Sequence, residues 1–320
     1  MTYQPTAISD DLNTLPKLPA WATLGRAETL ETVAFRSGAA LTVLDALVTD
    51  SAHGVPVKLL ANRLASKAAT TTSKLEGRLA READIRDAFH LTPPGEARGP
   101  DGDLLAFWRD AARLGLAWRD WQAGFRDLVG QSVADDVATW IKLGAVRASS
   151  DGPLAGCVSV LRVALEADDR AERFACLLSD VVLARALNWS TILPISAQCL
   201  TKAILRDLVA EGQGAELAVQ QRILDSVEDT VRVARELARG AAGLQAIAPK
   251  LRAKGSDAAV ALFLSEDAVA PSQMLAPMIQ GTTLPMTDRA ARRFCDRLVD
   301  LGVARELTGR PTFRLYGISP

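Results

Sequence analysis

Residues 287–318 read TDRAARRFCDRLVDLGVARELTGRPTFRLYGI, and this stretch decides the expected fold of the chain's end. Its first half predicts a helix that begins at residues 286–288, with Thr287 as N-cap, and ends near Asp300, before Gly302. Its second half predicts a β-hairpin with strands at 303–307 and 312–316 around a turn at 308–311. In such a hairpin, Phe313 and Leu315 would pack one strand onto the helix.

Two further helical segments precede this stretch, one at about 257–265 and a short one that Pro271 can begin. The order helix, short helix, helix, hairpin is that of a winged helix-turn-helix. A winged-helix domain is therefore expected over residues 253–320.

The rest of the chain is expected to be a bundle of helices. Hydrophobic residues make up 48% of the sequence but aromatic residues only 5%, so the core must consist mostly of Ala, Leu and Val, which favours helix packing. Apolar residues at three- and four-residue steps predict many helices, the longest over about 216–251. The expected fold class is all-α: an extended lead-in (1–20), a multi-helix bundle (21–252) and the C-terminal winged helix-turn-helix with its short β-hairpin.

Charge, cysteine content and hydropathy exclude several classes of protein. The 37 basic and 38 acidic residues nearly cancel, so any contact with nucleic acid must come from a local basic patch. The four cysteines lie far apart without a CxxC spacing, which indicates buried thiols and no metal or cofactor site. The N-terminus lacks the pattern of a secretory signal, and polar residues and Pro194 interrupt the most apolar stretch, 177–200. A cytoplasmic protein without membrane contact is expected.

The strongest candidate site is basic and lies in the last domain. From Thr287 onward there are seven arginines and four acidic residues, a local excess of three positive charges. A recognition helix contacts DNA mainly with its N-terminal residues, and arginine binds guanine or phosphate. The residues expected to contact DNA, from the helix and from the wing, are Thr287, Arg289, Arg292, Arg293, Arg310 and Arg314.

A second interpretation of the same arginines remains open. Asp288 and Asp296 can pair with those on the helix, and Arg314 can bridge to Glu306 across the hairpin. The domain would then contact a protein partner or a second copy of the chain.

A weaker candidate lies before the Pro/Gly-rich loop at 92–102, where Glu82, Asp84, Asp87 and His90 fall together. Asp87 and His90 are about one helical turn apart and could share a metal or a proton. With only two histidines in the chain and no second ligand cluster, a helix-surface or loop-capping role is the expected one. Phosphate-loop, dinucleotide-binding and nucleophile-elbow motifs are absent from the sequence.

Several segments resemble a bacterial family known as domain of unknown function fourteen-hundred-three. They are FRSGAALTVLDALV, NRLASKAATTTSKLEGR, IRDAFHLTPPGEARGPDGDLLAFWR, NWSTILPISA, APKLRAKGSD and the closing TDRAARRFCDRLVDLGVARELTGRPTFRLYGI. The resemblance covers nearly the whole chain and implies no established activity. The family is often encoded on plasmids and large secondary replicons.

The tail is also similar to the winged helices of Fic-type proteins, which transfer AMP with an HPFxxGNGR-type motif. Here His90 is followed by LTPPGEARG, without the Phe and Asn of that motif, so the activity is not carried over. The sequence therefore favours a non-enzymatic DNA-binding or accessory protein of a mobile replicon. The alternatives are a helical protein-interaction scaffold and, less favoured, a degenerate Fic-like enzyme.

Overall fold

The computed structural model of the chain describes residues 14–23, 25, 27–116, 121–129, 134–251 and 254–319. Throughout these residues the structure is mainly helical, which confirms the expected all-α class; its one sheet there has two antiparallel strands. Most of the expected lead-in (1–13) and the expected domain boundary at 252–253 lie outside the described residues. The division into two domains stays a prediction.

The elements follow one another along the chain with short connections. The helices are α1 (Ala20–Thr23), α2 (Leu30–Thr49), α3 (Val57–Leu75), α4 (Glu82–His90), α5 (Gly99–Arg113), α6 (Trp121–Val129), α7 (Ala134–Asp151), α8 (Pro153–Ala167), α9 (Glu172–Ala186), α10 (Lys202–Val209), α11 (Ala215–Ile247), α12 (Ser256–Phe263) and α13 (Asp288–Asp300). Single turns occur at η2 (Ser51–His53), η4 (Ser196–Gln198), η5 (Ala248–Lys250) and η6 (Pro271–Leu275), and the strands are β1 (Ala304–Glu306) and β2 (Tyr316–Ile318).

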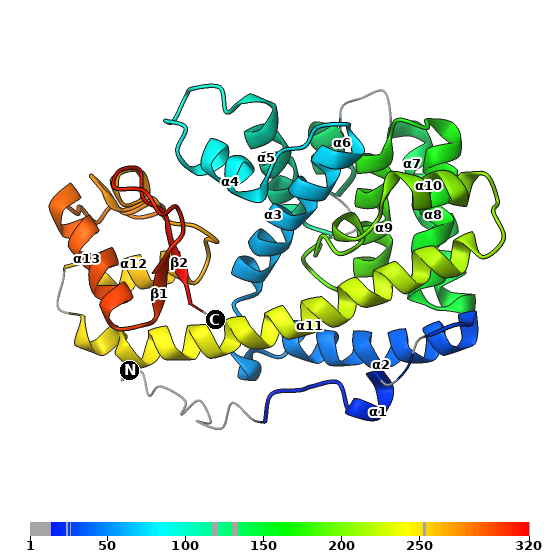
Figure 1. Cartoon of the computed structure of the whole chain (residues 1–320), viewed down its shortest axis with the longest axis horizontal. Coiled ribbons are helices and arrows are strands. Elements are labelled where there is room, and N and C mark those ends of the chain that lie inside the picture. Colours follow the sequence, from blue (N-terminus) through cyan, green and yellow to red (C-terminus); the bar gives the residue numbers. More distant parts are fainter. Residues whose placement is uncertain are drawn as a thin grey trace.

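The long helix α11 organises the molecule (Figure 1). It runs along one side, with α7–α10 gathered near its beginning and α12, α13 and the hairpin near its end. Its buried stripe contains Ile223, Val227 and Val231, as the three- and four-residue spacing predicts. Helix α2 packs along it, and Arg36 Nη2 lies 2.7 Å from Glu228 Oε1 between the two.

A connection buried in the core joins α9 to α10. Ile192, Leu193 and Ile195 are fully or almost fully enclosed, so the backbone N–H groups here need partners inside the protein. Asp180 of α9 supplies one: its Oδ1 accepts hydrogen bonds from the N–H of Ile195 (3.1 Å) and of Ser196 (2.7 Å). Burial raises the pKa of Asp180 to about 7.

The C-terminal elements follow the predicted order, but the hairpin differs from the prediction. The second strand is Tyr316–Ile318 and not 312–316, and Ala304, Arg305 and Glu306 pair with Ile318, Gly317 and Tyr316. Phe313 adopts a positive φ of 54° and is 72% exposed, so the expectation that it packs onto the helix is wrong, whereas Leu315 is fully buried.

Two interactions, one local and one between distant residues, explain this shift. The Glu306 carboxylate accepts hydrogen bonds from the N–H groups of Thr308 and Gly309, each at 2.7 Å, and this closes the chain into a wide turn. Tyr316 then pairs on its other side with Val269, through backbone hydrogen bonds of 2.7 and 3.0 Å. Strand β2 therefore begins at Tyr316, the residue that pairs with Val269.

Within the described part of the chain, α2 is the helix whose length and mean hydropathy of 1.3 would suffice to cross a membrane. About 33% of its apolar window is buried inside the protein.

Candidate nucleic-acid interface

Helix α13 forms as its sequence predicts. The Thr287 Oγ1 accepts a hydrogen bond from the Ala290 N–H at 3.3 Å, so Thr287 is the N-cap, and Gly302 follows the helix with a positive φ of 73°. Ala291, Phe294 and Leu298 are buried, and the Phe294 ring lies 6.3 Å from that of Phe263 on α12. This packing leaves the opposite side of α13 in solvent.

The exposed side of α13 carries a row of three arginines at four-residue spacing. Arg289, Arg293 and Arg297 are all exposed, and none of their side chains forms a hydrogen bond or ion pair with a residue in the described part of the chain. Arg297 was not among the predicted DNA contacts, although the step of four from Arg289 to Arg293 continues to it. We call Arg289, Arg293 and Arg297 the arginine row.

The other expected arginine of the helix is already paired. Arg292 Nη2 lies 2.8 Å from Asp288 Oδ2, one turn earlier, and Asp288 also accepts a hydrogen bond from Ser272 Oγ at 2.7 Å. Thr287 uses its hydroxyl oxygen as the helix cap. Both residues therefore have structural partners of their own.

The two hairpin arginines that were expected to contact DNA are likewise held within the protein. Arg314 Nη1 lies 3.9 Å from Asp296 Oδ1, and its Nε donates to the Arg310 carbonyl at 3.1 Å. The predicted alternative partner, Glu306, caps the turn instead. Arg310 Nη2 lies 2.8 Å from Asp87 Oδ2, so the tip of the hairpin contacts α4.

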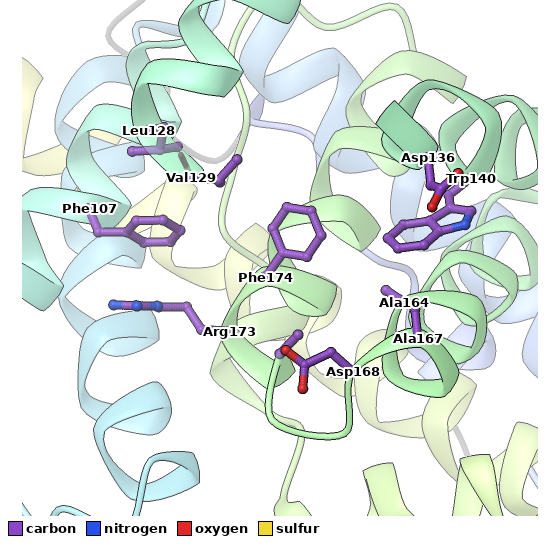
Figure 2. Close-up of a pocket in the computed structure, with 11 residues that line it drawn as sticks. Phe107, Leu128, Val129, Asp136, Trp140, Ala164, Ala167, Asp168, Arg173 and Phe174 are labelled. Carbon is purple, nitrogen blue, oxygen red and sulfur yellow. The ribbon is translucent and has the colours of Figure 1, made fainter. Parts of the chain in front are cut away.

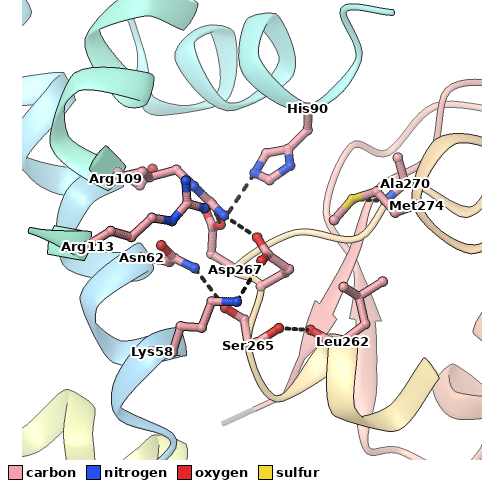
Figure 3. Close-up of polar contacts among 12 residues, drawn as sticks. Lys58, Asn62, His90, Arg109, Arg113, Leu262, Ser265, Asp267, Ala270 and Met274 are labelled. Atoms are coloured by element: carbon pink, nitrogen blue, oxygen red, sulfur yellow. Dashed lines mark hydrogen bonds and ion pairs between the residues drawn. The ribbon is translucent and has the colours of Figure 1, made fainter. Parts of the chain in front are cut away.

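A buried charge cluster fixes this C-terminal part to the rest of the protein (Figure 3). Arg109 of α5, which is 1% exposed, pairs with both Glu266 and Asp267, which follow α12. Lys58 Nζ lies 3.6 Å from Glu266 Oε1, and His90 Nε2 lies 3.4 Å from Asp267 Oδ1. Burial disfavours the charge of Asp267, but His90 and Arg109 together hold its pKa well below the usual range.

The cluster corrects the expectation for the segment before the Pro/Gly-rich loop. His90 is only 5% exposed and faces Asp267, so a helix-surface role is wrong for it. Asp87 pairs with Arg86 and Arg310, and the Ser66 hydroxyl donates to Glu82 at 3.4 Å. Asp84 pairs with Arg81 at 3.0 Å, so each of the three acids has its own partner. Among the described residues, no group of three or more His, Cys, Asp or Glu side chains could hold a metal ion.

The cysteines are free thiols, and Cys157, Cys176 and Cys295 are buried as predicted. Burial raises the pKa of Cys157 to about 12, so its thiol remains protonated at neutral pH. This environment suits packing and does not favour nucleophilic chemistry.

A family model described as "Protein of unknown function (DUF1403)" matches residues 6–318. The chain belongs to this family. The match to DUF1403 extends from the N-terminal helices through α13 and both strands, so the arginine row lies inside the family region. None of the curated proteins matches the chain. The similarity of the tail to Fic-type proteins stays a prediction.

Proposed function

We propose that this DUF1403 protein binds DNA through a C-terminal winged helix, with α13 as the recognition helix, and that it acts without catalysis as an accessory protein of a mobile replicon. The order α12, Val269, η6, α13, β1, β2 supports the winged-helix assignment. So does the pairing of β2 with β1 on one side and with Val269 on the other, because it joins the hairpin to the segment between the first two helices.

The arginine row is the observation that carries the proposal. Its three guanidinium groups are exposed and unpaired within the described residues, so they can meet phosphates without first breaking ion pairs. Arginine also forms bidentate contacts with guanine in the major groove. Asp296 and Asp300 lie near the end of α13, so Arg289 and Arg293 in its first half should contribute more to the contact than Arg297.

The experiment measures binding to a fluorescent DNA duplex by anisotropy at several salt concentrations. Replacing Arg289, Arg293 and Arg297 together by Ala should abolish most binding and lower the slope of log K against log salt by up to about 3. The matched control replaces Arg170, Arg206 and Arg222, which are also exposed and belong to the α8–α9 connection, to α10 and to the first third of α11. Figure 1 shows α8, α9 and α10 toward the beginning of α11 and α13 toward its end. The proposal fails if wild-type protein does not bind at low salt, or if both triple variants lose binding equally.

The second candidate function, a protein-interaction scaffold, is favoured by the exposed ring of Phe313. It borders a cavity of about 460 Å³ between the hairpin, η6 and α13 that is also lined by Arg292, Arg314 and Tyr316. A protein partner would bury this ring, as aromatic residues are enriched in interfaces. Loss of a co-purifying partner in Phe313→Ala, with DNA binding absent from wild type, would select this function.

A further inference from the structure

A pocket lies between α5, α6, α7 and the adjoining ends of α8 and α9 (Figure 2). Its volume is about 580 Å³, within the usual range of small-molecule sites. Three aromatic rings line it, and Figure 2 shows the ring of Phe174 between those of Phe107 and Trp140. The apolar side chains of Leu128, Val129, Ala164, Ala167 and Ala171 also line it.

The one basic side chain of the lining, Arg173, shares the carboxylate of Glu76 with Arg78, whose Nη2 lies 2.8 Å from Glu76 Oε2. The guanidinium of Arg173 lies 4.7 Å from the centre of the Phe107 ring, and its Nε lies 3.3 Å from Glu76 Oε1. An anionic ligand would therefore compete with Glu76 for this cation.

The two acidic side chains of the lining have no such partner. Asp136 and Asp168 are exposed, and neither forms an ion pair with a residue that the structure describes. The Asp168 Oδ1 accepts a hydrogen bond from the Arg170 N–H at 2.9 Å, which fixes the carboxylate at the rim. Figure 2 places Asp136 beside Trp140 and Asp168 below Phe174.

Aromatic rings, together with carboxylates that have no ion-pair partner among the described residues, favour a positively charged ligand. A ring attracts a cation to its face, and carboxylates nearby add Coulombic attraction, while apolar substituents on the cation replace water against the rings. We propose that this pocket binds a small organic cation of the quaternary ammonium type, with its charged group near Trp140 and Phe174 and the two carboxylates at the rim.

The test is isothermal titration calorimetry of the full chain with choline and with 3,3-dimethylbutan-1-ol, which has nearly the same shape without the charge. Choline should bind at least about tenfold more tightly, the ratio that 1.4 kcal/mol of charge interaction produces. The proposal is overturned if choline gives no binding heat at millimolar concentration, or if the neutral alcohol binds as tightly.

Two variants locate the site. Asp136→Asn with Asp168→Asn should reduce the preference for choline to less than about threefold, and the amide oxygen introduced at position 168 can still accept the Arg170 hydrogen bond. Trp140→Leu should weaken choline binding by about tenfold. In the matched control, Asp169→Asn with Asp207→Asn removes the same charge outside the pocket and should leave binding unchanged. The proposed site would be refuted if the Asp136→Asn, Asp168→Asn variant kept the wild-type preference for choline over the neutral alcohol. It would also be refuted if the control variant lost as much of that preference.

Discussion

Replacing Arg109 by Leu should destabilise the protein more than most single substitutions. Arg109 is 1% exposed and is the shared partner of Glu266 and Asp267. Without its guanidinium, the two carboxylates stay in a largely buried site, with Lys58 and His90 as the remaining bases. Removing one partner from a buried ion pair typically costs about 3–5 kcal/mol, because the other charge is left without compensation.

Arg113→Leu is a matched control on the same helix, one turn later. Arg113 Nη1 lies 3.1 Å from Asp110 Oδ1, but both side chains are more than half exposed. An exposed pair of this kind contributes about 0–1 kcal/mol. The two substitutions remove the same side chain, so the difference between the free energies of unfolding of the two variants reports the effect of burying the charge cluster.

Urea unfolding followed by circular dichroism measures both variants at pH 7. The reasoning is refuted if Arg109→Leu lowers the free energy of unfolding by no more than about 1 kcal/mol beyond Arg113→Leu. Combining Arg109→Leu with Glu266→Gln and Asp267→Asn should recover part of the loss, since no unpaired carboxylate then remains. The depressed pKa of Asp267 means that its contribution is present above about pH 4 and is lost as the pH falls below that value.

Two other substitutions test the buried connection and the contact of the C-terminus with α11. Burial raises the pKa of Asp180 to about 7, above its value in the unfolded chain. The folded state therefore binds this proton more tightly than the unfolded state does, and protonation at low pH stabilises the fold. The free energy of unfolding should therefore fall between about pH 4 and pH 7, and Asp180→Asn, which keeps the Oδ1 acceptor, should lack this decline. Unfolding of both proteins at about pH 5 and pH 8 measures the decline, and an equal pH dependence in the two would contradict the prediction. A Cβ at Gly240 would lie 2.7 Å from Ile318 Cγ2 and closer still to the Ser319 carbonyl oxygen. Gly240→Ala should therefore lower the free energy of unfolding by about 1–3 kcal/mol, measured by thermal or urea unfolding. Gly243→Ala, whose Cβ would have its nearest neighbour at 3.9 Å, should stabilise α11 by up to about 1 kcal/mol. If Gly240→Ala were the more stable of the two variants, the C-terminal residues would not press against this helix.

Local signals in the sequence were enough to predict several of the helices. The expected long helix over 216–251 corresponds to α11 with its short extension η5, because its apolar residues keep one period throughout. Thr287 and Gly302 marked the ends of α13 because a cap and a positive φ depend on neighbouring residues alone. The arginine row was incomplete in the prediction only because Arg297 belongs to the second half of the helix.

The strand positions and the charge cluster could not be predicted in the same way. Tyr316 begins β2 because it binds Val269, a residue far away in the sequence. Arg109 and Asp267 are 158 positions apart, and nothing near either residue identifies the other as its partner. Such pairings depend on how the elements pack in three dimensions, which the spacing of residues within one element does not encode.

The pairing of Arg310 with Asp87 bears on how much the hairpin adds to the proposed contact with DNA. The Arg310 side chain is 53% exposed, so its ion pair is worth about 0–1 kcal/mol. Asp87 would not be left alone on release, because Arg86 Nη2 also lies 2.7 Å from its Oδ1. Arg310 can thus leave at small cost, but a phosphate contact would replace an existing ion pair. The arginine row gives up no such pair within the described residues, so each of its phosphate contacts would be a net gain, and the proposed affinity rests on α13.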